Sequence, residues 1–355
     1  MRKWAIILCV AGQLAVLAFM VFGREWIIHT GTQVQIATAP IDPRDPFRGD
    51  FVRLRYGLNS LGYAPARWQP ATYEPKKGDK VFAVLEPRPG GLHDVSYFTN
   101  VAPAADTGAL YIRGRMKPSA RWSRSTAVDA AFGIEQLFVE QGSGLDIEKR
   151  RGIRGGLQNA MHARVSIGDT GTAVLTGFDW SALAIGLDIS PTFALVQAIN
   201  ESRANVANDG TTAAPTDDPD PPSPPLRLTV SNVSDDILML NNPAGNCGFR
   251  LEPAARMDSA YFEPENVCAD ALPRLLTLAV GDSLVIDIDL ADPRWHMSRS
   301  IDGVVKSGDV RTFDDFTEWF RLAYRSDRQG TEIEGNALWQ GDLLSQAFNA
   351  RGQRD

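Results

Sequence analysis

Residues 41–56 have the sequence IDPRDPFRGDFVRLRY, a stiff, charged segment that leads into a predicted β-strand. Pro43 and Pro46 each fix φ, remove a backbone donor and push the preceding residue toward extended conformations, so the first half cannot be helical. Gly49 tolerates a positive φ and Asp50 can bond its own backbone, which predicts a turn. The rest alternates as a half-buried strand does, with Val52, Leu54 and Tyr56 on one face and Phe51, Arg53 and Arg55 on the other.

The same Gly-Asp device occurs twice more along the chain. Gly78-Asp79 precedes the strand-like residues 81–85, and Gly281-Asp282 precedes residues 284–288. Three such turns, each followed directly by a predicted strand, predict a mainly β protein. They favour a structural over a functional role for Gly49-Asp50.

Two sequence blocks carry a family resemblance. Residues 49–56 follow the pattern Gly-Asp-Phe-x-x-Leu-x-Tyr, and residues 132–148 form the second block, FGIEQLFVEQGSGLDIE. In this order, with the proline-rich lead-in at 40–48, they resemble the GDYXXLXY family over about residues 24–180. The chain departs from the family at three positions. Phe51 and Leu137 stand where the family tends to have Tyr, and Gln141 stands where it tends to have Pro.

The resemblance implies a membrane-anchored bacterial envelope domain of unassigned function. Because such domains are often encoded beside multi-spanning membrane proteins, it also implies a multi-spanning membrane protein as partner. The family supplies no catalytic residues that could be carried over to this chain.

Composition excludes some function classes. At 355 residues the chain is long enough for two domains. Its net charge of −7 argues against a nucleic-acid binder, which would show a basic surplus. The four histidines and three cysteines show no Cys-x-x-Cys or His-x-x-x-His spacing, so neither a metal site nor a cofactor is expected.

An apolar run, residues 4–22, begins just after Arg2 and Lys3 and contains Gln13 as its only strongly polar residue. Nineteen helical residues span about 28 Å, close to the thickness of the bilayer hydrocarbon. The run therefore predicts a single transmembrane anchor, residues 1–23, that contacts the lipid bilayer through residues 4–22. The basic N-terminus favours a cytoplasmic start, which places the bulk of the chain in the periplasm outside a bacterial inner membrane. The alternative is a signal peptide cleaved after Gly23.

Export changes the interpretation of the cysteines. Cys9 lies inside the apolar run, which leaves Cys247 and Cys268 as a pair in an oxidising compartment. We predict a disulfide between them. It would close a loop of about twenty residues and contribute about 3 kcal/mol in the chain-entropy model. The alternative is two free buried thiols.

Two β domains are expected after the anchor. Residues 24–200 contain many strand patterns, including a hairpin formed by 163–167 and 173–178, a strand at 183–189 and a short helix that begins near Ser190. Residues 201–225 shift to Pro, Asp and Thr and predict a disordered linker that holds the next domain away.

The second domain, residues 226–350, is expected to be a β-sandwich. Its strand candidates have the spacing of such a fold and resemble bacterial immunoglobulin-like modules. Tyr324 is then either a corner tyrosine or an ordinary core residue. The predicted fold class is thus mainly β: a transmembrane helix, a β-rich domain and an immunoglobulin-like sandwich.

Chemistry could come only from charged residues of the two blocks. The candidate catalytic carboxylates are Asp45, Asp50, Glu135 and Glu140, and the candidate binding residues are Arg44, Arg48, Arg53 and Arg55. If the blocks meet in space, two carboxylates could act as acid and base on a glycoside. The alternative is that the arginines pair with Glu135 and Glu140 and hold a loop on a sheet.

Two functions therefore stand. The first is a non-enzymatic envelope protein that binds another membrane or envelope protein. The second is a carboxylate-dependent hydrolase of cell-envelope glycan.

Overall fold

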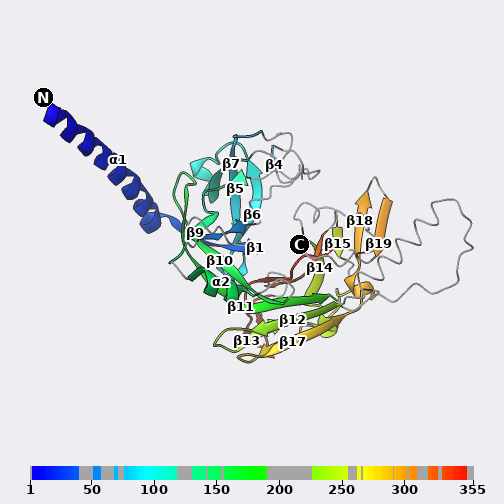
Figure 1. The fold of residues 1–355 in the computed structure, drawn as a ribbon. Helices are drawn as coiled ribbons and strands as arrows, with labels where there is room; N and C mark the ends of the chain where they lie inside the picture. The colour runs from blue at the N-terminus through cyan, green and yellow to red at the C-terminus, as the bar shows by residue number, and fades with distance from the viewer. Residues whose placement is uncertain are drawn as a thin grey trace, which may run out of the picture. The chain divides into compact units, whose positions relative to one another are not determined.

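The fold is mainly β, as predicted, with one long N-terminal helix followed by many short strands (Figure 1). The chain divides into two compact units: unit 1 comprises Met1–Gly144 and Met161–Asp179, and unit 2 comprises Leu145–Ala160 and Trp180–Asp355. The computed structural model describes residues 2–39, 51–56, 68–70, 76–117, 130–140, 143–152, 156–189, 226–254, 262–264, 267–290, 292–301, 304–308, 310, 319–326 and 330–349.

Helix α1 spans Arg2–Thr30 and contains the predicted anchor. The most apolar 18 residues of its segment Ile6–Thr30 have a mean hydropathy of 2.5, and none of them is buried against the rest of the chain. Within the described ranges it is the one helix long and apolar enough to cross a membrane. The helix continues past Gly23, where the sequence expected the anchor to end, because nothing breaks the helical pattern before Gly31.

The strands of unit 1 form two sheets and one pair. One sheet has the order β4-β6-β5-β7-β8, and β2 pairs with β9. The second sheet has the order β11-β10-β1-β3, to which β10 contributes its residues from Met161 on and β11 its residues up to Asp179. The elements are β1 Thr32–Ala39, β2 Phe51–Arg53, β3 Arg55–Tyr56, β4 Trp68–Gln69, β5 Lys80–Pro87, η2 Pro89–Gly91, β6 His93–Thr99, η3 Ala105–Thr107, β7 Tyr111–Met116, β8 Ala130–Ala131, β9 Gln136–Phe138, β10 Leu157–Ile167 and β11 Ala173–Ile189.

The predicted hairpin is confirmed by β10 and β11, which are joined by a tight turn. Gly171 N–H donates to the Gly168 carbonyl over 2.8 Å, and Gly168 N–H donates to the Thr172 carbonyl over 3.0 Å. Gly171 has a φ of +72°, and a Cβ at this position would lie 2.4 Å from the ring of Tyr111. Glycine is therefore required at this turn both by its backbone conformation and by the space available.

Both Gly-Asp segments that the structure describes form turns, as predicted, but their aspartates bond an N–H group that precedes them rather than one two residues further on. The Asp79 carboxylate accepts from Lys76 N–H over 2.9 Å, and the Asp282 carboxylate accepts from Ala279 N–H over 3.0 Å. Gly78 and Gly281 have φ values of +86° and +79°. Each aspartate thus closes a turn on the residue three positions earlier.

Unit 2 contains the remaining strands. Their orders are β11-β12-β17, β13-β16, β14-β20-β23, β15-β18-β19 and β21-β22. The elements are β12 Leu226–Asn232, β13 Leu238–Asn241, η4 Ala244–Asn246, β14 Phe249–Pro253, β15 Phe262–Pro264, β16 Leu275–Leu278, β17 Ser283–Ile288, η6 Pro293–Trp295, β18 Met297–Ile301, β19 Val304–Gly308, β20 Phe320–Arg325, β21 Glu332–Ile333, β22 Asn336–Ala337 and β23 Asp342–Leu344.

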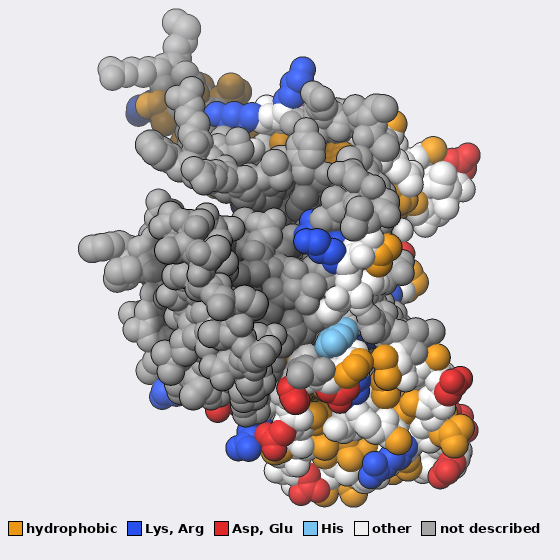
Figure 2. Space-filling model, turned by 90° about the vertical axis from the view of Figure 1, so that its right-hand side faces the viewer, with side chains coloured by type: hydrophobic (Ala, Val, Ile, Leu, Met, Phe, Trp, Pro, Cys, Tyr) orange, Lys and Arg blue, Asp and Glu red, His pale blue; other side chains and the backbone are white. Residues whose placement is uncertain are grey.

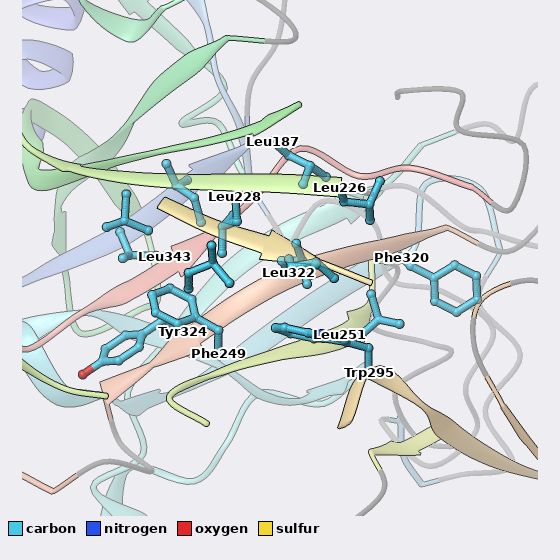
Figure 3. Close-up of a cluster of buried hydrophobic side chains, with 14 of the residues drawn as sticks. Leu187, Leu226, Leu228, Phe249, Leu251, Trp295, Phe320, Leu322, Tyr324 and Leu343 are labelled. Carbon is cyan, nitrogen blue, oxygen red and sulfur yellow. The ribbon is translucent and has the colours of Figure 1, made fainter. Parts of the chain in front are cut away.

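The core of unit 2 lies between strands that are far apart in the sequence. Leucines of β11 and β12 lie on one side, and residues of β14 and β20 lie on the other (Figure 3). Tyr324 is fully buried there, with its ring 5.3 Å from that of Phe249 and 6.3 Å from that of Trp339. This position supports the core interpretation of Tyr324. The immunoglobulin-like assignment stays a prediction.

One long-range pairing places the predicted linker in a new context. The second half of β11 pairs antiparallel with β12, from Leu183↔Asn232 to Ile189↔Leu226. The two ends of the segment 190–225 are therefore neighbours in one sheet of unit 2. The linker predicted at residues 201–225 stays a prediction. The segment itself, with the helix expected near Ser190, lies outside the described residues.

A helix that was not predicted from the sequence lies at the end of the second block. Helix α2 spans Ser143–Arg151, with Asp146 in its first turn and basic residues in its last turn. This charge arrangement complements the helix dipole. Arg150 of this helix lies over the ring of Trp180, 5.4 Å from the ring centroid.

Candidate functional site

The two sequence blocks meet in space and form what we call the motif junction, residues 51–56 and 130–140. Strand β2 pairs antiparallel with β9, with Phe51 opposite Phe138 and Arg53 opposite Gln136. Just beyond this pair, Leu54 N–H donates to the Glu135 carbonyl over 2.8 Å. The condition on which the acid–base hypothesis depended, contact between the blocks, is met.

The face of the first block that the alternation assigned to the core is buried. Val52, Leu54 and Tyr56 are 1%, 3% and 1% exposed. The Tyr56 hydroxyl donates to the Ile134 carbonyl over 2.7 Å. Burial raises the pKa of Tyr56 well above its usual range, and the nearby Glu135 charge raises it further. The phenol therefore stays protonated and acts as a hydrogen-bond donor between the blocks.

Glu135 closes a turn in the second block. Its two carboxylate oxygens accept from Phe132 N–H over 2.6 Å and from Gly133 N–H over 2.9 Å. Gly133 has a φ of +82°, which favours glycine at this position. Hydrogen bonds from backbone N–H groups to a carboxylate are strong, so this side chain has a clear structural role.

The other candidate residues named from the sequence are either exposed or described only in part. Glu140 is exposed, and its backbone carbonyl accepts from Ser143 N–H over 3.0 Å near the start of α2. Arg53 and Arg55 lie in β2 and β3, but the structure does not describe their side chains. Four further candidates lie outside the described residues, namely Arg44, Asp45, Arg48 and Asp50. Among the residues described, no group of three or more His, Cys, Asp or Glu side chains could hold a metal ion.

The C-terminal end of α1 is hydrogen-bonded to the β10–β11 hairpin of unit 1. The Ile27 carbonyl accepts from Gly31 N–H over 2.9 Å and from the Ser166 hydroxyl over 2.6 Å. The Ile28 carbonyl accepts from the Gln33 amide over 3.1 Å. A Cβ at Gly31 would lie 2.6 Å from both the Ile27 carbonyl oxygen and Ser166 Oγ. Helix and sheet are thus joined through one glycine rather than through a spacer.

A charged cluster on β14, β20 and β23, centred on Arg325, is the second candidate site. Arg325 pairs with Glu252 at 2.8 Å and with Asp342 at 2.6 Å, and these side chains are 11%, 13% and 23% exposed. Burial alone would lower the pKa of Arg325, but the hydrogen bonds and charges of the two carboxylates outweigh it and raise the pKa.

Arg321 lies near this cluster, four residues before Arg325 on β20. Its Nε is buried and has no hydrogen-bond partner among the described residues. Burial, and then the charge of Arg325, lower the pKa of Arg321 to about 10. This site was not predicted from the sequence, although alternation in β20 separates Arg321 and Arg325 from the core residues Leu322 and Tyr324. Elsewhere, acidic and basic side chains are interspersed with hydrophobic ones on the described surface that Figure 2 shows.

The predicted disulfide is confirmed in unit 2. Cys247 and Cys268 are bonded, with their Cα atoms 5.7 Å apart. Cys9, the third cysteine of the chain, is free and exposed on α1.

Comparison with known proteins identifies one part of the chain. Residues 13–178 match the family described as GDYXXLXY protein. The match begins within α1 and ends one residue before the end of unit 1 at Asp179. A search of the curated proteins and of the solved structures finds no match to the chain. The segment that carries both motifs, residues 13–178, therefore matches the GDYXXLXY family, as the resemblance predicted.

Proposed function

We propose that this protein is a non-enzymatic component of a bacterial envelope, anchored in the inner membrane by α1 with both β units outside. The observation that carries this proposal is the exposure of α1. The segment Ile6–Thr30 is 25 residues long, and none of its most apolar part packs against the described chain. So much exposed apolar surface on a helix of this length is stabilised by lipid.

Two further observations support the orientation. Arg2 and Lys3 precede the apolar run, which favours a cytoplasmic N-terminus. The Cys247–Cys268 disulfide lies in unit 2, and disulfides persist in the periplasm but are rare in the cytosol.

We further propose that the β units bind another membrane or envelope protein, with a multi-spanning membrane protein as the implied partner. The direct junction at Gly31 supports this role, because it would hold unit 1 close to the membrane surface. The hydrolase alternative needs two carboxylates about 5–10 Å apart that face a substrate. Of its candidates, Glu135 already uses both oxygens to accept backbone hydrogen bonds.

The anchor and its orientation are tested by fractionation and a topology reporter. Carbonate washing should leave the full chain in the membrane, and alkaline phosphatase fused at the C-terminus should be active while green fluorescent protein at the same place stays dark. A variant with Leu14→Arg and Leu17→Arg should lose membrane retention, because each charge is costly at mid-span. Val285→Arg, at an exposed site of unit 2, is the matched control and should leave retention unchanged.

The results that would overturn the anchor are release of the native chain by carbonate or fluorescence of the fusion in the cytosol. An intact mass that corresponds to a chain cleaved after Gly23 would establish the signal-peptide alternative instead. Crosslinking in native membranes tests the partner. Recovery of a multi-spanning protein supports the proposal, and its reproducible absence counts against it.

A further inference from the structure

Gln13 is a polar side chain in the middle of the proposed membrane span. It is the midpoint of the apolar run 4–22, it is exposed on α1, and it has no hydrogen-bond partner among the described residues. The hydrocarbon of a bilayer offers neither donors nor acceptors, so an amide held there without a partner is unfavourable. A partner for Gln13 is required only if α1 spans the membrane as proposed, because in water the Gln13 amide would hydrogen-bond to water.

Gln13 lies on a regular seam along the helix. Because α1 is continuous from Arg2 to Thr30, residues spaced alternately by three and four lie along one face. The seam through Gln13, all of it exposed, consists of Ile6, Cys9, Gln13, Val16, Met20 and Gly23. This is the a/d pattern of a two-helix coiled coil with one polar residue at an a position, which sets register and partner number in such pairs. Cys9 and Gly23 are small, and small residues allow transmembrane helices to approach closely.

We infer that α1 pairs in parallel with α1 of a second copy of this chain, with the two Gln13 amides hydrogen-bonded to each other. All copies insert with the same topology, so two neighbouring helices are parallel and place identical residues at the same depth. A primary amide carries both donors and an acceptor, so it is complementary to itself. A second copy therefore supplies the required polar group at the required depth.

Cys9 provides a native probe for this pairing. Cys9 is the seam residue that directly precedes Gln13, about one helical turn earlier. The other two cysteines of the chain are already bonded to each other. Membranes that contain the full-length protein are treated with membrane-permeable copper phenanthroline. Two Cys9 thiols then release two protons to water, pass one electron to each of two copper(II) ions, which become copper(I), and form an intermolecular disulfide. We expect a dimer on non-reducing gels that dithiothreitol converts back to the monomer.

Two sets of variants distinguish specific pairing along the seam from crosslinking by chance collision of the helices. Moving the thiol to a neighbouring face with Cys9→Ala and Leu8→Cys should lower dimer yield at least fivefold at equal expression. Gln13→Leu with Cys9 intact should lower it severalfold, and Gln13→Asn, which keeps the amide, should restore most of it.

Several results would overturn the pairing. They are an absence of dimer in carbonate-resistant membranes, equal yield from Leu8→Cys, equal yield from Gln13→Leu, or a Cys9 adduct with a different protein. These outcomes leave the anchor standing. Release of the native chain by carbonate would overturn the anchor itself and the pairing with it, so the two failures are distinguishable.

Discussion

The hydroxyl of Tyr56 donates a hydrogen bond of 2.7 Å to the backbone carbonyl of Ile134, a residue 78 positions later in the chain. This bond ties the last residue of the first motif to the second motif. The ring fills the core of the motif junction while the hydroxyl pairs an otherwise buried carbonyl. A tyrosine at this position thus does two structural tasks at once.

Tyr56→Phe should lower the free energy of unfolding by about 1–3 kcal/mol, because it leaves the Ile134 carbonyl buried without its donor. The measurement is denaturant unfolding of the purified full chain in detergent. Tyr111→Phe is the matched control, since the Tyr111 hydroxyl bonds the Asp169 carbonyl at an exposed site over 3.3 Å. It should change stability by less than about 0.5 kcal/mol. Equal losses in the two variants would contradict the account.

Replacement of Glu135 distinguishes a turn-closing carboxylate from a catalytic one. Glu135→Ala should cost about 2 kcal/mol of stability, because the N–H groups of Phe132 and Gly133 lose a charged acceptor. Glu135→Gln keeps one acceptor oxygen and should cost less. Glu140→Ala, at an exposed site of the same block, should be nearly neutral by the same unfolding assay. An unchanged stability for Glu135→Ala would remove the structural role and revive the acid–base hypothesis.

Gly31→Ala should disrupt the junction between α1 and unit 1. Its Cβ would lie within 2.8 Å of three oxygen atoms, those of Ile27, Ser166 and Ile167, so the backbone must shift at a cost of about 1–3 kcal/mol. Gly12→Ala changes another glycine of α1 that has nothing within 4 Å of its Cβ position, and it should be tolerated. The thermal unfolding midpoints of the two variants are compared. A Gly31→Ala protein as stable as Gly12→Ala would show that the junction is loose.

Arg325→Met should be strongly destabilising. It leaves Glu252 and Asp342 partly buried without their main partner, at a cost of about 3 kcal/mol. Arg227→Met removes an ion pair with Asp287 of similar length, 2.7 Å, but those side chains are 61% and 64% exposed. This control should cost at most about 1 kcal/mol. The experiment is chemical denaturation of both variants, and similar midpoints for the two would be the opposing result.

Stability should fall at alkaline pH partly through Tyr324. Burial raises the pKa of Tyr324 to about 12, although the backbone of Asn241 lowers it in part. Below about pH 10 the phenol is neutral in both states. Between about pH 10 and 12 the unfolded chain releases this proton while the folded one retains it, so stability falls with rising pH. The loss is about 2–3 kcal/mol at most.

Denaturant midpoints of the native protein and of Tyr324→Phe at pH 9 and pH 11.5 check this effect. The variant should lose less stability between the two pH values, with a residual slope because burial also raises the pKa of Tyr56. Identical slopes would mean that Tyr324 ionises as easily in the folded state as in the unfolded one.

Local patterns were sufficient for much of the fold and for part of the motif junction. The alternation after Gly49-Asp50 correctly assigned Val52, Leu54 and Tyr56 to the core, and the hairpin at 163–178 was found from its turn residues. Helix α2 was missed because most of its residues are charged and its apolar residues show no helical periodicity. The only sequence feature that indicates a helix there is the acidic first turn and basic last turn. The structural use of Glu135 could not be predicted, since a carboxylate that closes a turn and one that serves catalysis look the same in sequence.

The sequence by itself determined the apolar N-terminal helix, the mainly β character, the Gly-Asp turns at 78–79 and 281–282 and the Cys247–Cys268 pair. Each of these depends on residue type and spacing within a short window, or on which cysteines remain once one is assigned to the membrane. Only the tertiary structure decided that β2 meets β9, that β11 pairs with β12 across residues 190–225, and that Arg325 lies between Glu252 and Asp342. Pairings between distant segments depend on the burial gained by all strands together, which no single window of sequence contains.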